Sequence, residues 1–229
     1  MSENRQTTVR YLIQQVIIVA LFAASLFISA GDIGWLIGWI FIAIFAFSQI
    51  LITIVLSRKN PELMGERAES KGERDLDRVL AGIMALFGPI SICIVAGLDF
   101  RFDWKFEILY SVQITGIVIT VSGALLSAWA MGANKYFYGV FRIAEDKEHQ
   151  VCDSGPYQYV RHPGYLGAIL FDIGAPFMLN SAWALIPAIL TVFAIIIRTG
   201  YEDKSLHKKL NGYKEYMQEV EYRLFPWVW

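Results

Sequence analysis

Long apolar stretches alternate with short polar connections along the whole chain. Six of these stretches are long enough to cross about 30 Å of hydrocarbon as helices, and they cover residues 11–30, 35–57, 79–98, 106–131, 163–180 and 182–200. The fifth is the weakest because Asp172 and Pro176 interrupt it, and only a few residues around Asn180 separate it from the sixth. We therefore expect an all-α fold: a polytopic membrane bundle of about six transmembrane helices, the last two forming a tight hairpin.

Lysine and arginine residues are unevenly distributed over the connections. They cluster in the segment 58–78, in the connection 132–161 and in the tail after residue 203, whereas the connections around Asp32, 99–104 and Asn180 carry almost none. Because basic residues mark cytoplasmic loops, both termini are expected in the cytoplasm. The start of the chain has no cleavable-signal pattern, so the first apolar stretch is expected to remain as an anchor.

The charged segment 58–78 is the best candidate for a boundary. It would separate an N-terminal transmembrane hairpin with its cytosolic loop, residues 1–78, from a core at 79–229. Its charges are of mixed sign, and Pro61 and Gly65 interrupt it. These features favour a solvated connector over a binding element.

Composition excludes several classes of function. Lys and Arg total 20 against 21 Asp and Glu, so no nucleic-acid partner is expected. The two cysteines, Cys93 and Cys152, are too few and too differently placed for a disulfide framework. The spacing of His149 and Cys152 suggests a metal, but no second pair accompanies them and zinc needs at least three protein ligands. No metal site is therefore predicted.

The stretch GPYQYVRHPGYLG, residues 155–167, combines polar groups with a locked backbone at the start of an apolar run. Pro163 fixes its own φ and disfavours the helical region at His162, so a helix should begin here with unpaired N–H groups that suit an anion. Arg161 could supply charge to a ligand. The aromatic walls would be Tyr157, Tyr159 and Tyr165. The alternative is an interfacial tyrosine belt with a snorkelling arginine.

A second polar group closes the last apolar stretch. Arg198 and Glu202 are four positions apart, hence on one helix face, and Asp203 follows. Glu202 could simply neutralise Arg198, or both could be solvated at the interface. If the last two spans form a hairpin, however, His162, Arg198 and Glu202 would meet in one cytoplasm-facing pocket.

The C-terminal part of the chain resembles a known family. The segment NKYF…EHQVCDSGPYQYVRHPGYLGAILFDIG…RTGYEDKSL…GYKEYMQEVEYRLFP, within residues 130–229, is similar to the C-terminal domain of isoprenylcysteine carboxyl methyltransferases and related membrane phospholipid methyltransferases. The combination of GxY, RHPxY and a later RxxxE is specific. The resemblance implies an S-adenosylmethionine-dependent methyltransferase with a cytosolic cofactor pocket, whose lipophilic or amphiphilic acceptor enters from the bilayer.

The resemblance also implies residue roles. It assigns cofactor contacts to His149, Gln150, Val151, Cys152, Tyr157, His162, Pro163, Gly164, Tyr165 and Glu202. Arg198 matches the arginine on the substrate side, so Arg198 and Glu202 are the expected catalytic pair. Arg142 stands near the place of a cofactor-contacting glutamine, and Asp203 stands where many relatives have a second glutamate.

The acceptor and two other classes of protein stay open at this point. A carboxylate acceptor is already ionised and needs only orientation by Arg198, whereas a protonated amine or a thiol would need a base, for which Glu202, Asp203 and His162 are available. The alternatives to a methyltransferase are a membrane sterol-type reductase that uses NADPH and a non-catalytic membrane scaffold. Asp172 is expected near mid-membrane, where a hydrogen-bonded structural role is favoured over a substrate contact.

Overall fold

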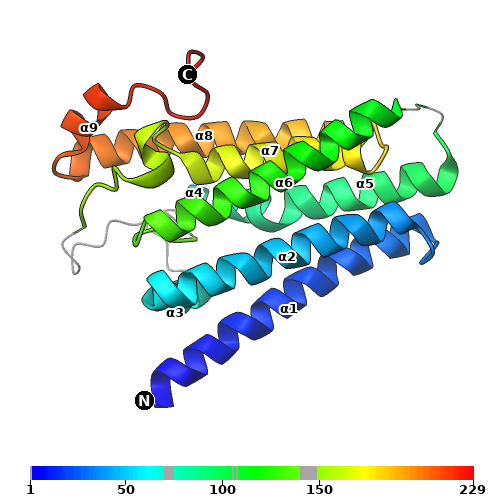
Figure 1. The fold of residues 1–229 in the computed structure, drawn as a ribbon, viewed down its shortest axis with the longest axis horizontal. Helices are drawn as coiled ribbons and strands as arrows, with labels where there is room; N and C mark the ends of the chain where they lie inside the picture. Colours follow the sequence, from blue (N-terminus) through cyan, green and yellow to red (C-terminus); the bar gives the residue numbers. More distant parts are fainter. Residues whose placement is uncertain (1, 70–74, 105, 107, 140–148) are drawn as a thin grey trace.

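The computed structural model describes residues 2–69, 75–104, 106, 108–139 and 149–229. Within these ranges the elements are helical and no strand occurs. Figure 1 shows the long helices lying side by side along the longest axis. They are α1 (Ser2–Ala30), α2 (Leu36–Lys59), α5 (Gly88–Phe102), α6 (Tyr110–Ala133), α7 (Pro163–Met178) and α8 (Leu185–Lys209). The shorter ones are α3 (Pro61–Glu69), α4 (Asp75–Gly82) and α9 (Tyr213–Glu219). The predicted all-α bundle is confirmed.

Five helices of the described chain are long and apolar enough to cross a membrane: Thr8–Ala30, Leu36–Lys59, Asp75–Phe102, Tyr110–Ala133 and Leu185–Lys209. The third combines α4 and α5 through a short π-helical turn at Ile83–Phe87. The remaining predicted span is α7, which has 16 residues, fewer than the roughly 20 needed to cross the hydrocarbon. Ten residues of α7 are buried, so this helix is an interior element of the bundle.

Helices α6 and α7 pack backbone against backbone. A Cβ atom on Gly123 would lie 2.5 Å from the carbonyl oxygen of Gly167, and a Cβ atom on Gly167 would lie 2.7 Å from that of Gly123. Gly116 and Gly174 repeat this close approach at the other end of the pair. Small residues let membrane helices come this close, and the contact fixes the position of the start of α7.

The predicted hairpin between the last two helices is confirmed. Asn180 adopts the left-handed conformation, with φ 57°, which asparagine tolerates better than most residues. The Ser181 hydroxyl donates to Asp99 Oδ2 at 2.6 Å and accepts from the Ala184 amide at 3.2 Å. This turn brings the C-terminal half of α8 back to the start of α7.

Asp172 lies inside the bundle on α7. The residue is 3% exposed, and its Oδ2 atom has no hydrogen-bond partner among the described residues. The expected hydrogen bond to this oxygen is therefore not found there.

The polar segments of the chain gather at one end of the bundle. Figure 1 shows the start of α1, helix α3, the connection after α6 and helix α9 at the left end. The connections 31–35 and 179–184 lie at the other end, as do residues 103–104 and 108–109. The segments that the sequence assigns to the cytoplasm thus share one end.

Within segment 58–78, residues 61–69 are not the solvated connector that the sequence predicted. Residues 61–69 form α3, in which Leu63 and Met64 are 2% and 3% exposed. They pack in a cluster with Tyr11 and Leu56. Pro61 begins the helix rather than breaking it, because the first helical position needs no backbone donor. Helix α3 therefore forms part of the bundle.

Candidate functional site

The start of α7 is held by the C-terminal tail. The amides of Arg161 and His162 donate to the carbonyls of Tyr222 and Arg223, each at 2.9 Å. His162 has φ −127° and ψ 60°, outside the helical region, and Pro163 begins the helix. The backbone restriction predicted from the HP dipeptide is confirmed.

Arg161 does not offer its charge to a ligand, contrary to the sequence-based expectation. Its Nε and NH2 atoms bind the two oxygens of Asp203 at 2.9 and 3.2 Å. Its NH1 atom donates to the carbonyls of Val220 and Glu221 at 2.8 and 2.7 Å. The residue is 6% exposed, so Arg161 ties the tail to α8.

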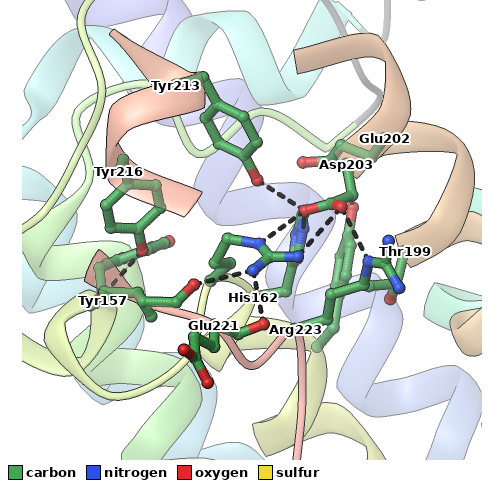
Figure 2. A network of polar contacts seen from close by, with 12 residues as sticks. Tyr157, His162, Thr199, Glu202, Asp203, Tyr213, Tyr216, Glu221 and Arg223 are labelled. Carbon is green, nitrogen blue, oxygen red and sulfur yellow. Dashed lines mark hydrogen bonds and ion pairs between the residues drawn. The ribbon is translucent and has the colours of Figure 1, made fainter. Parts of the chain in front are cut away.

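Asp203 is the centre of this network, as Figure 2 shows. Besides Arg161 it contacts His162 Nε2 at 3.3 Å, the Tyr213 hydroxyl at 2.8 Å and Arg223 Nε at 2.8 Å. Burial and the neighbouring Asp203 charge raise the pKa of Tyr213, so this hydroxyl remains a donor. Of the bases that the sequence suggested, Asp203 is fully occupied by structural contacts.

Glu202 has a different environment although it is the adjacent residue. The Tyr165 hydroxyl donates a hydrogen bond to Glu202 Oε2. The Tyr165 ring stacks on the His162 ring, with centroids 5.6 Å apart and planes 1° from parallel. This stacking orients the tyrosine that holds the carboxylate.

Arg198 lies one helical turn from Glu202 but binds other groups. Its Nε atom donates to Asp77 Oδ1 at 2.9 Å and its NH2 atom to the Gly139 carbonyl at 3.1 Å. The guanidinium carbon is 5.4 Å from the centre of the Tyr165 ring. The simple neutralisation of Arg198 by Glu202 that the sequence left open is therefore not what the structure shows.

A pocket brings these groups together. It is lined by nine of the ten residues that the resemblance assigned to the cofactor: His149, Gln150, Val151, Cys152, Tyr157, His162, Gly164, Tyr165 and Glu202. Arg198 lines it as well. The tenth residue, Pro163, is not in the lining and serves to begin α7. Tyr159 is 65% exposed and takes no part in the wall, and Arg142 lies outside the described residues.

Several wall residues were not predicted from the sequence. They are Asn134, Tyr136, Phe137, Tyr138, Leu206, Leu210, Tyr213 and Tyr216. The available signal was the aromatic run NKYFY directly after α6. A second signal was the pair of tyrosines in the tail, three positions apart on α9, which places them on one helix face.

The part of the wall formed by residues 134–138 and 149–157 is rich in aromatic side chains and uncharged at neutral pH. The Tyr136 and His149 rings lie 4.0 Å apart, and burial together with the Lys135 charge lowers the pKa of His149 to about 4. Burial raises the pKa of the Cys152 thiol and of Tyr157. At neutral pH these three side chains are therefore neutral. The acid that lines the pocket, among the described residues, is Glu202.

Comparison with known proteins finds a family match for this region. Residues 116–208 match the model of the isoprenylcysteine carboxyl methyltransferase (ICMT) family. A "Probable protein-S-isoprenylcysteine O-methyltransferase" of Oryza sativa subsp. indica is 29% identical over 112 residues, which are 48% of this chain and 59% of the relative. "Protein-S-isoprenylcysteine O-methyltransferase B" of Arabidopsis thaliana is 29% identical over 114 residues, 46% and 55% of the two chains.

The chain thus spans less than two thirds of the length of these curated relatives. The ICMT region runs from α6 to nearly the end of α8 and confirms the resemblance seen in the sequence. Parts of the site lie outside it. Leu210, Tyr213 and Tyr216 follow the matched region, and Asp77, the partner of Arg198, precedes it.

Proposed function

We propose that this integral membrane protein transfers a methyl group from S-adenosylmethionine to a lipophilic or amphiphilic acceptor. The observation that carries the proposal is the single pocket in which residues 149–152, Tyr157, Tyr165 and Glu202 meet Arg198. Sequence positions that are distant along the chain converge there. The names of the curated relatives support the same activity.

The groups in the pocket fit S-adenosylmethionine. Bound there, the cofactor would supply a methyl group already activated on a sulfonium. The Glu202 carboxylate suits an ammonium or ribose hydroxyls. Aromatic and neutral walls, among them Tyr136, Tyr157 and the neutral His149, suit a ring and a cation. The residues need only bind and orient the two reactants and exclude water.

The acceptor side would be the Arg198 end of the pocket. Arg198 lies four residues before Glu202 on α8, which is about 6 Å toward the middle of the helix. A carboxylate such as that of an isoprenylcysteine is ionised at neutral pH, so Arg198 could orient it without a base. We therefore propose a prenylated cysteine carboxylate as the acceptor class.

The pocket and both termini are proposed to face the cytoplasm. Basic residues fill the segments at the pocket end of the bundle, as cytoplasmic loops require.

Isothermal titration of the purified protein with S-adenosylmethionine, S-adenosylhomocysteine and NADPH tests the function. We expect binding of the two sulfur compounds and none of NADPH. Methylation of N-acetyl-S-farnesylcysteine with labelled donor, beside a lipid extract, then tests the acceptor class. Binding of NADPH alone would instead favour the sterol-type reductase, and binding of none of the three would favour a scaffold.

A further inference from the structure

Asp77 on α4 forms a largely buried ion pair with Arg198 on α8. The Nε–Oδ1 distance is 2.9 Å and the two side chains are 14% and 4% exposed. The residues are 121 positions apart, so the contact depends on the docking of α4 against α8. Asp77 lies before the region that matches the ICMT family, and no motif pointed to it.

Three contacts fix the orientation of the Arg198 guanidinium. Besides Asp77, they are the Gly139 carbonyl at 3.1 Å from NH2 and the Met84 sulfur at 3.5 Å from NH1. A guanidinium is planar, so anchoring its Nε and one terminal nitrogen sets its plane. These contacts use three of the five N–H groups that an arginine carries. As far as the described part of the chain is concerned, the other two N–H groups of Arg198 remain available to bind an acceptor.

Glu202 is a competing partner for Arg198. The two residues are four positions apart on α8, a spacing at which an acid and a base attract each other along a helix. Glu202 instead accepts the hydrogen bond of Tyr165. If Arg198 turned toward Glu202, the carboxylate proposed for the donor would be neutralised and the acceptor side would lose its cation.

We propose that Asp77 is a positioning residue that holds Arg198 toward the acceptor and prevents it from pairing with Glu202. This inference rests on the proposed function. Asp77 acts through Arg198 and touches neither reactant. In this arrangement the segment before the family region completes the site: α8 supplies both charges of the RxxxE motif, and α4 keeps them apart.

Asp77→Asn tests the effect on the acceptor, with Asp75→Asn as the matched control. Asp75 lies on the same helix, its side chain is 98% exposed and it pairs with Arg78 at the surface, so the control removes the same charge without touching Arg198. We expect Asp77→Asn to raise the KM for N-acetyl-S-farnesylcysteine roughly tenfold, the loss of one charge-assisted contact. Asp75→Asn should stay within about twofold, since exposed pairs contribute little.

The affinity for S-adenosylhomocysteine gives a readout that needs no turnover. In Asp77→Asn, Arg198 is released toward Glu202, so the affinity should fall roughly three- to tenfold, about 1 kcal/mol. In an Arg198→Gln background, Asp77→Asn should cause no further loss, because no cation remains to pair with Glu202. A purely structural role of Asp77 would weaken binding in both backgrounds.

The outcomes separate this inference from the proposed function. If the wild-type protein neither binds S-adenosylhomocysteine nor methylates the probe, both are overturned. If the wild-type protein does both and Asp77→Asn has the same acceptor KM as Asp75→Asn, only the positioning role is overturned. Equal losses of S-adenosylhomocysteine affinity on Asp77→Asn in the wild-type and Arg198→Gln backgrounds would overturn the positioning role as well. If Asp77→Asn does not fold, Asp77→Glu replaces it in the test. This variant keeps the charge but places it one methylene further from the backbone, so its acceptor KM should lie between the wild-type value and the tenfold increase expected for Asp77→Asn. A wild-type KM in Asp77→Glu would then assign Asp77 to the fold alone.

Discussion

Arg161 and Asp203 form a two-contact ion pair in the interior of the pocket end of the bundle, with distances of 2.9 and 3.2 Å. The pair joins the segment before α7 to α8, and through two backbone carbonyls it also holds the C-terminal tail. Arg161 directly precedes His162 and Asp203 directly follows Glu202 in the sequence. The ion pair therefore helps to fix the positions of two residues that line the pocket.

Asp203→Asn should destabilise the protein without a specific effect on the donor. The change leaves Arg161 buried without its full counter-charge, and breaking a buried pair in this way costs about 3–5 kcal/mol. Thermal unfolding in detergent should show a clear drop in the apparent Tm, compared with Glu215→Gln at an exposed position of α9. An unchanged Tm for Asp203→Asn would mean that the network contributes little to the fold.

The proposed orientation predicts a labelling pattern. In a background without Cys93 and Cys152, a single cysteine replacing Lys214 on α9 should react with a membrane-impermeant reagent only after the cytoplasmic side is opened. A cysteine replacing Phe106, which is 64% exposed at the opposite end of the bundle, should react from outside. The reverse pattern would invert the topology and move the pocket to the other side of the membrane.

The spans and the start of α7 could be predicted because their causes are local. An apolar run predicts a membrane helix wherever it occurs, and Pro163 restricts His162 whatever the fold around it. The resemblance then supplied the pocket residues as a set, since nine of the ten line one pocket.

The pairing of the charged side chains could not be predicted, because it depends on the tertiary structure. Arg161 looked like a ligand-binding group until Asp203, 42 positions later, was found to occupy it. Asp77 looked like one of many surface charges in a connector. Nothing in the sequence near Arg198 shows that its partner comes from 121 positions earlier. The close α6–α7 contact had a signal that was missed, a spacing of seven residues between Gly116 and Gly123 and between Gly167 and Gly174.

Glu202→Gln should weaken the donor more than it disturbs the fold. The amide keeps the size of the side chain and can still accept from Tyr165, but it loses the charge offered to the donor. Charge-assisted hydrogen bonds contribute about 1.5–3 kcal/mol, so titration with S-adenosylhomocysteine should show a loss of roughly ten- to a hundredfold. Unchanged affinity, with an unchanged Tm, would remove Glu202 from the donor site.

His149 should stay neutral well below the usual range of histidine. Burial, and secondly the Lys135 charge, lower its pKa to about 4 in the folded protein, against about 6.5 for a free side chain. Between these pH values the unfolded chain binds the extra proton, so the contribution of His149 to stability is present above about pH 6.5 and declines as the pH falls toward 4. The NMR titration of its ring, assigned among three histidines with His149→Asn, should show a midpoint near pH 4.

The variant Lys135→Gln separates the two causes. Removing the like charge should move the midpoint of His149 upward by a fraction of the total shift, since burial is the larger cause. A midpoint near the free value in the unaltered protein would show that water reaches the ring and that the wall near Tyr136 is open.

Arg198→Ala should separate the binding of the two reactants. Arg198 lines the pocket one turn from Glu202 and donates to Asp77, Met84 and Gly139. In Arg198→Ala, S-adenosylhomocysteine should therefore bind within a few-fold of normal, while methyl transfer to N-acetyl-S-farnesylcysteine collapses. Arg198→Lys should recover only part of the rate, because an ammonium lacks the planar fork that contacts a carboxylate twice. The lysine variant also keeps a charge beside Asp77 and so controls for folding. Loss of S-adenosylhomocysteine binding in both variants, at an unchanged Tm, would move Arg198 to the donor site, and normal turnover in Arg198→Ala would leave it no part in the reaction.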